Sequence, residues 1–225
     1  MLYKFRRFFS INNSYGAIGI GSMIVFIAMV LVAGIAASVL IVTSGQLEAQ
    51  AMDTGDQTRD EVSSDISVSD ITGQFGTRTI DGISYSRFHN MTITVSARSA
   101  STIALDKTII KISNEDNLII LSWDSNKYSS SASASGVFLT NGLFDLSANK
   151  FGIIVGNDRD NSCTSSYPAI NKGDIVYLTI NLSACFNGLA YRTDITGKII
   201  PEQGSPGVFL FRTPASTSRT IVDFL

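Results

Sequence analysis

The chain has 225 residues, a formal net charge of −2 and a charged fraction of only 16%. A nucleic-acid-binding protein would carry a basic surface, so that class is excluded and no nucleic-acid partner is expected. The length allows one large domain, or a domain with an appended segment.

The first predicted element is a long apolar helix. No charged residue lies between Arg7 and Glu48, and the densest apolar run covers residues 23–42. About 20 apolar residues are enough for a helix to cross a bilayer. The run is too long for the core of an ordinary secretory signal. Lys4, Arg6 and Arg7 precede it, so the positive-inside rule keeps the N-terminus in the cytoplasm and exports the rest.

A helical pattern continues beyond the apolar run, at Leu47, Ala51, Thr54, Thr58, Val62 and Ile66. A helix from residue 19 to about 66 would be on the order of 70 Å long, over twice a bilayer's thickness. Its interior is rich in small residues, namely Gly19, Gly21, Ala33, Gly34, Ala37 and Ser38. Small residues four apart let helices approach closely where lipid gives no apolar driving force. We therefore expect this helix to pack against other helices, the alternative being a single-pass helix that tolerates small residues.

The segment YGAIGIGSMIVFIAMVLVAGIAASVLI, residues 15–41, closely resembles the N-terminus of archaeal flagellins (archaellins), the subunits of the archaeal swimming filament. The resemblance implies a type IV pilin-like signal over residues 1–16. A prepilin-type peptidase would cut after Gly16 and leave Ala17 as the new N-terminus. Losing three basic residues would change the formal net charge from −2 to −5. The same segment would thus serve first as an export anchor and afterwards as a structural helix.

Short β-like runs dominate from about residue 71, and Gly73 and Gly76 are expected to end the helix. Several runs alternate apolar and polar residues, as strands with one buried face do. They cover residues 79–88, 91–97, 108–113, 118–123, 136–140, 151–156, 174–182, 190–200, 207–213 and 219–225. We predict an α+β fold, with a hydrophobic α-helix over residues 17–70 and an immunoglobulin-like all-β sandwich or barrel over 71–225. Residues 168–182 and 197–214 extend the resemblance to archaellins.

Two cysteines, Cys163 and Cys185, are predicted to form a disulfide in the exported domain. Such a bridge would close a loop of about 22 residues and contribute roughly 3 kcal/mol. Two buried free thiols are the alternative. The single histidine, His89, is expected to be a partly exposed strand residue.

Two N-glycosylation sequons lie in the exported part, Asn90–Met91–Thr92 and Asn181–Leu182–Ser183. A third, at Asn12, falls in the leader. The resemblance raises the expectation of an N-linked glycan, because archaellins are commonly glycosylated. Asn181 lies inside a predicted strand, where the transferase would be obstructed, so Asn90 is the favoured site.

The loop GNDRDNS, residues 156–162, places Asp158, Asp160 and Asn161 close together. Oxygen ligands at this spacing suit a hard cation such as Ca²⁺. A solvated Asp/Asn turn would explain the same residues without a metal. Asp124 with Asn126 is a second, weaker candidate pair. We expect no required cofactor, and a structural Ca²⁺ is the one ion that the sequence indicates.

No catalytic motif is present, whether a nucleophile elbow, a P-loop, a zinc-protease helix or a dinucleotide fingerprint, so we predict that the protein is not an enzyme. The resemblance implies a structural subunit of the archaellum, the rotating extracellular filament for swimming, which polymerises through its N-terminal helices, alone or with paralogous archaellins. It also implies that the precursor sits transiently in the cytoplasmic membrane. The implied partners are the peptidase and the membrane platform and ATPase of the assembly motor.

Two other functions remain open from the sequence. One is an archaeal adhesion pilin, and the other is a surface binding protein that keeps an uncleaved single-pass anchor. Bacterial-type pilins usually have Glu at the fifth mature position, where this chain has Gly21. That residue favours the archaellin interpretation.

Overall fold

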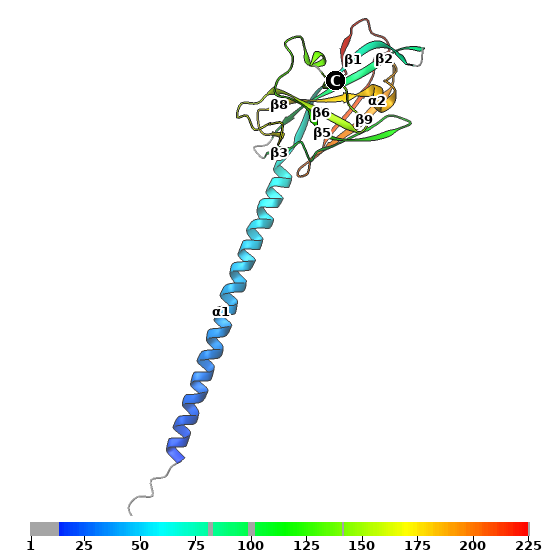
Figure 1. Cartoon of the computed structure of the whole chain (residues 1–225). Coiled ribbons are helices and arrows are strands. Elements are labelled where there is room, and N and C mark those ends of the chain that lie inside the picture. The colour runs from blue at the N-terminus through cyan, green and yellow to red at the C-terminus, as the bar shows by residue number, and fades with distance from the viewer. Residues whose placement is uncertain (1–13, 81–82, 99–101, 141, 225) are drawn as a thin grey trace, which may run out of the picture. The chain divides into compact units, whose positions relative to one another are not determined.

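The computed structural model describes residues 14–80, 83–98, 102–140 and 142–224 (Figure 1). The basic leader and the sequon at Asn12 therefore lie outside the described residues. The chain divides into two compact units, residues 1–56 and 57–225.

The first unit consists of most of helix α1, which spans Ser14–Ser63. No proline precedes Pro168, so nothing in the sequence interrupts the helical hydrogen bonds. Hydroxyls in its apolar part are satisfied within the helix: Ser22 Oγ donates to the Gly19 carbonyl (2.9 Å) and Thr43 Oγ1 to the Val39 carbonyl (2.9 Å). The apolar half therefore presents no unpaired hydroxyl donor at these two positions.

α1 ends earlier than predicted, and strand β1 (Ile66–Ile80) begins three residues later. The prediction of a helix through residue 70, ended by Gly73 and Gly76, is wrong, because both glycines lie inside β1. Ile66 does continue the spacing of four residues from Val62, but Ile66 and Val68 also alternate with serines. This two-residue period resumes after a bulge between Val68 and Asp70, and it is the one that the chain adopts.

The second unit is built on one nine-stranded sheet, in the order β10-β9-β4-β5-β6-β8-β2-β1-β11. Neighbouring strands are antiparallel except the parallel pair β5–β6. Besides β1, the strands are β2 (Ile83–Ala97), β4 (Ile109–Ser113), β5 (Leu118–Ser129), β6 (Lys150–Asn157), β8 (Ile175–Asn181), β9 (Asp194–Ile200), β10 (Gly207–Arg212) and β11 (Ile221–Asp223). A separate two-stranded sheet joins β3 (Ile103–Ala104) to β7 (Ala169–Ile170).

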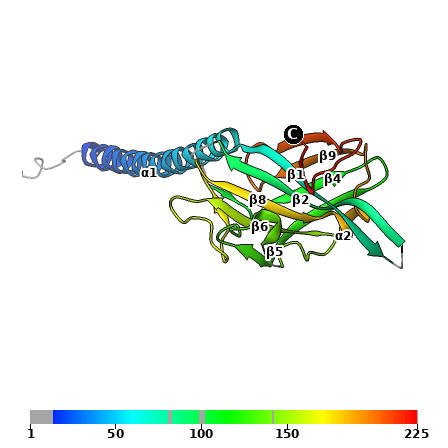
Figure 2. The same cartoon turned by 90° about the horizontal axis from the view of Figure 1, so that it is seen from above.

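The sheet curls until its two ends approach each other (Figure 2). Asp65, just before β1, forms a parallel bridge with Ser205, just before β10, and the Ser205 amide donates to the Ser64 carbonyl (2.8 Å). Phe224, after β11, packs against Phe88 of β2 and stacks on Phe211 of β10, with ring centroids 5.1 and 4.7 Å apart. The predicted helix followed by a β-rich, barrel-like domain is thus confirmed, as a single curled sheet.

The core lies inside this curl and draws on most of its strands. Alternate residues of β9 and β10 point inward, which the burial of Ile195, Ile199, Phe209 and Phe211 demonstrates. The central strand β6 is buried along five consecutive residues. The largest fully buried side chains include Phe88, Phe151, Ile71, Met91, Ile93 and Leu121.

Two local expectations differ from the structure. Residues 136–140, expected to form a strand, contain the 3₁₀ helix η1 (Val137–Leu139), which follows Gly136 at φ 120°. The short helix α2 (Leu182–Phe186) follows β8 directly, because the Asn181 side chain accepts from the Ala184 amide and caps it. Both are single turns that strand periodicity does not reveal.

His89 is buried, contrary to the expectation of partial exposure. Its exposed fraction is 7%. Nε2 lies 3.0 Å from the Gly76 carbonyl and Nδ1 lies 2.9 Å from Ser183 Oγ. A carbonyl only accepts, so Nε2 carries a proton. The imidazole thus ties β2 to β1 and to α2.

Candidate assembly, cation and modification sites

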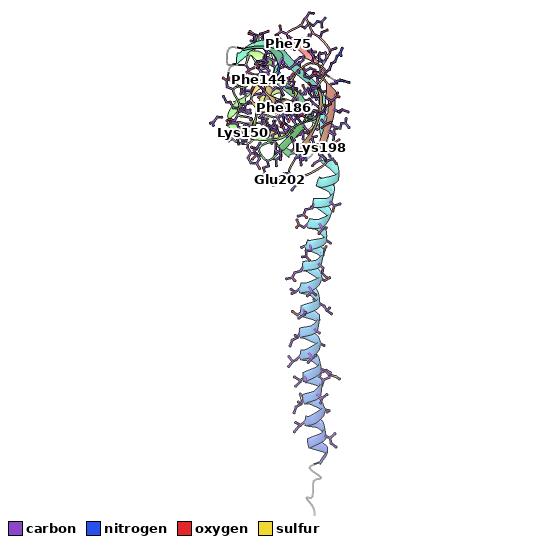
Figure 3. All side chains as sticks on the ribbon, turned by 90° about the vertical axis from the view of Figure 1, so that its right-hand side faces the viewer. Phe75, Phe144, Lys150, Phe186, Lys198 and Glu202 are labelled. Carbon is purple, nitrogen blue, oxygen red and sulfur yellow. The ribbon has the colours of Figure 1, made fainter. Side chains whose placement is uncertain are left out.

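The apolar side chains of α1 form a long exposed surface. Its large apolar side chains from Ile18 to Val42 are all about half exposed or more, and they project on all sides of the helix (Figure 3). Residues Ile18–Arg59 are long and apolar enough, by length and composition, to cross a membrane. In water such a surface must be covered, at roughly 25 cal/mol for each Å² of apolar area.

The small residues predicted to mediate packing lie along this exposed helix. Among the described residues, and apart from the adjacent helix backbone, no atom comes within 4 Å of a Cβ built on Gly19, Gly21 or Gly34. Ala33 with Ala37, and Gly34 with Ser38, form adjacent one-turn steps on α1. Within the helical unit these positions are exposed, which leaves them open to contact with other helices.

The predicted cleavage bond, between Gly16 and Ala17, lies in the first turn of α1. Gly16 is exposed, with nothing within 4 Å of a Cβ built there. The bond precedes the apolar residues that begin at Ile18. Cleavage here would therefore leave the whole apolar surface in the mature chain.

Three carboxylates converge beside the loop of residues 156–162. Ligand oxygens of Asp158, Asp160 and Asp174 all lie within 4.8 Å of one another. The structure thus joins Asp158 and Asp160, which the sequence indicated, to a third acid that it did not. Asn161, the third predicted ligand, is on the same turn at φ 57° with an exposed side chain. Asp174 escaped notice because it belongs to the turn before β8, and no local pattern links it to the loop.

Neighbouring donors hold these carboxylates in place. The Ser162 amide donates to Asp158 Oδ1 and Asp160 Oδ1, both at 3.2 Å, and the Cys163 amide donates to Asp158 Oδ2 at 3.0 Å. Asn171 contacts two of the acids, through Nδ2 to Asp160 Oδ2 (2.6 Å) and through its amide to Asp174 Oδ2 (2.9 Å). The loop is therefore preorganised around its acids.

The electrostatics of the cluster fit a cation. The Asn171 hydrogen bond, helped by Ser162, lowers the pKa of the exposed Asp160, which keeps it ionised. Asp174 is only 2% exposed, and in the described part of the chain no lysine or arginine pairs with any of the three acids. A buried carboxylate beside two others calls for a positive charge. The second candidate pair reduces to a turn, because Asp124 Oδ1 accepts from the Asn126 amide (3.0 Å).

The two sequon asparagines face each other across the β2–β8 ladder, where Asn90 is the register partner of Asn181. Both polar side-chain atoms of Asn181 are hydrogen-bonded: Nδ2 donates to the Leu146 carbonyl (3.1 Å), and Oδ1 caps α2. Asn90 Nδ2 donates to Gln74 Oε1 (2.8 Å), and Asn90 borders an open hollow lined by η1. Both asparagines are half-buried, and Asn90 is the one that borders this hollow.

The disulfide predicted between the two cysteines is not formed: Cys163 and Cys185 are free thiols. Cys163 follows Ser162, whose hydroxyl lies 3.4 Å from Asp174 at the start of β8, whereas Cys185 lies in α2 beyond the end of that strand. The seven residues of β8 span roughly 20 Å, far beyond the reach of about 7 Å between bridged Cα atoms. Burial is the main cause that raises the pKa of Cys163 to about 12 and of Cys185 to about 11.

Comparison with known proteins places these features in context. The family model described as archaeal-type flagellin matches residues 16–211. Flagellin B2 of Methanocaldococcus jannaschii is 43% identical over 211 residues, which cover 93% of this chain and 94% of the relative. Flagellin B3 of Methanococcus voltae is 32% identical, covering 94% and 96%.

Two solved structures share the fold. The crystal structure of archaeal flagellin FlaB1 from M. jannaschii aligns with a TM-score of 0.62 at 23% identity, over 72% of this chain and 96% of that one. The archaeal flagellum of Methanospirillum hungatei aligns with a TM-score of 0.61 at 14% identity, over 91% and 98%. The second alignment therefore covers most of this chain.

Proposed function

Because the chain belongs to the archaeal-type flagellin family, we propose that it is a structural subunit of the archaellum, the rotating extracellular filament that drives archaeal swimming. Family membership assigns it a structural role rather than an enzymatic one. The observation that carries the proposal is α1, whose apolar surface is exposed in the single chain. Packing of many copies would bury that surface in a common core.

The apolar helix has two environments in this proposal. In the precursor it lies in the cytoplasmic membrane, oriented by the basic leader. There lipid tails and neighbouring helices are about equally apolar, so transfer into a filament gains little hydrophobic free energy. Close packing at the small residues gives the contact its specificity, and the assembly motor supplies the work. Once outside, separation would expose the helices to water, so the polymer persists.

Assembly requires partners that act at the membrane. A prepilin-type peptidase would cut after Gly16, and a membrane platform with its ATPase would lift the mature chain into the filament base. Cleavage removes Lys4, Arg6 and Arg7, and with them the charges that hold the N-terminus at the cytoplasmic face. The other filament partners are further copies of this chain, alone or with paralogous subunits.

The decisive experiment combines N-terminal sequencing with electron microscopy of appendages sheared from cells that express the chain. We expect filaments whose subunit begins at Ala17. An intact Met1 in a protein that stays in the membrane would contradict the proposal and support the anchored binding protein. Deleting the gene should abolish swimming and leave surface attachment intact, whereas the reverse result would indicate an adhesion pilin.

We further propose that Asp158, Asp160 and Asp174 hold a structural Ca²⁺. Carboxylate oxygens are the ligands that a hard cation prefers, and carbonyls and water would complete its coordination. The ion would join the loop before β7 to the turn before β8. We also propose that Asn90 carries an N-linked glycan, whereas Asn181 stays unmodified because its Nδ2 donates to the Leu146 carbonyl and its Oδ1 caps α2. Glycan mass mapped to each asparagine in the purified filament tests this.

A further inference from the structure

The outward face of strands β10, β9, β4 and β5 is apolar where a solvent-facing sheet surface would be polar. Six side chains on it are 41–66% exposed: Ile109, Leu118, Ile120, Ile200, Val208 and Leu210. They alternate with the inward-facing core residues of the same strands. We call these six residues, with the lysines between them, the lysine face.

Two lysines occupy the middle of the lysine face. Lys111 of β4 is the register partner of Lys198 of β9, with Val208 beside Lys198 and Ile120 beside Lys111. In the next row Ile109 is opposite Ile200. Directly opposed residues have Cβ atoms roughly 5 Å apart, and like charges there are destabilising. Neither lysine pairs with a carboxylate among the described residues. Figure 3 marks Lys198.

This arrangement is costly for an isolated domain, and it fits a partner that brings carboxylates to the two lysines and an apolar side chain to their apolar neighbours. An exposed apolar patch of several hundred Å² marks an interaction site. The opposed ammonium groups would gain from carboxylates placed between them. The partner that matches is a surface on which carboxylates flank an apolar side chain.

The same chain carries such a surface on the C-terminal part of α1. Glu48, Met52 and Asp56 recur every four residues and share one side of the helix, and Asp53 lies next to them. The described side chains there are exposed, with Met52 at 63%. Residues 46–59 contain three carboxylates and one arginine, Arg59, so this segment carries a net negative charge.

We propose that the lysine face docks on the acidic side of α1, around Met52, of a second copy of this chain. This inference rests on the proposed filament function and specifies one of its subunit contacts. The apolar ring excludes water around the ammonium–carboxylate pairs, which strengthens them. The contact joins unlike surfaces of identical chains, and such heterologous contacts build open helical polymers.

Carbodiimide cross-linking of intact native filaments tests the contact without any substitution. Filaments mixed from light and ¹⁵N-labelled subunits should give peptides that join Lys111 or Lys198 of one copy to Glu48, Asp53 or Asp56 of another. Cross-links from these lysines only to β-domain carboxylates would overturn the proposal. The proposal would also be overturned if Lys111 and Lys198 form no cross-link and react fully with an added amine-reactive acylating reagent.

Charge reversal tests the consequence. Lys198→Glu should reduce filament yield at least tenfold, and it should raise the apparent melting temperature of the subunit, because it replaces a like-charge pair by an attractive one. Arg219→Glu is the matched control, an exposed charge outside the lysine face, and should leave the yield unchanged. Normal filament yield from Lys198→Glu would refute this inference alone. Failure of the unaltered chain to form filaments would instead refute the proposed function.

Discussion

The substitution Asp174→Asn isolates the charge of the proposed cation site. Asp174 Oδ2 accepts from the Asn171 amide and from Ser162 Oγ (3.4 Å), and an amide oxygen can accept the same two bonds. The change therefore removes one negative charge while it preserves shape and hydrogen bonding. Because three carboxylates lie within 4.8 Å, the metal-free variant should be at least as stable as the parent chain.

The expected difference in melting temperature follows from the thermodynamic linkage between cation binding and folding. A cation at one hundred times its dissociation constant stabilises the folded state by about 2.7 kcal/mol. For a unit of this size, covering residues 57–225, each kcal/mol moves the melting temperature by roughly 2–4 °C. The parent chain should therefore melt about 5–10 °C higher in Ca²⁺ than in a chelator. Asp174→Asn should lose most of that difference.

Differential scanning calorimetry of purified filaments, in calcium and in chelator, provides the measurement. Asp124→Asn is the matched control, because Asp124 forms only a local turn with Asn126, and it should keep the full calcium response. Identical melting of the parent chain in both buffers would refute the cation site. An unaltered calcium response in Asp174→Asn would show that the ion binds elsewhere.

Three further outcomes are expected. Gly197→Ala should lower the unfolding free energy, measured by urea titration, by about 1–3 kcal/mol, because the added Cβ would enter the Phe209 ring. Gly76→Ala should cost less, because its Cβ would stay 3.7 Å from its nearest neighbour. Equal costs for the two substitutions would contradict the packing argument. Asn90→Gln should remove the glycan mass from the subunit. Asn181→Ala should remove no glycan mass, but it should destabilise the subunit by about 1 kcal/mol because the helix cap of α2 is lost. A glycan found on Asn181 would contradict this prediction. Both thiols should alkylate at least roughly a hundredfold more slowly in native protein than in urea at pH 8, since their folded pKa values of about 12 and 11 exceed the ordinary 9.0. A disulfide-linked Cys163–Cys185 peptide in non-reduced mass spectra would contradict this.

The prediction from local periodicity failed where a helical spacing and a strand spacing overlap, around Ile66. Val62 and Ile66 continue a helical spacing, from which we predicted a helix, while Ile66 and Val68 begin a strand. Pairing with β2 along nearly the whole of β1 decided the outcome. Gly73 was expected to end a helix, yet it is a strand residue whose missing side chain makes room for the Phe224 ring. That contact joins residues about 150 positions apart.

The sequence by itself determined the long apolar helix and the β-rich second unit, because both follow from composition and from periods that span a few residues. Its terminal segments carried the family resemblance. Only the tertiary structure brought Asp174 to Asp158, opposed Lys111 to Lys198, and separated the two cysteines along β8. Each of these relations depends on which strands become neighbours and in what register. Register is settled by packing of the whole curled sheet, and no short segment of the chain encodes it.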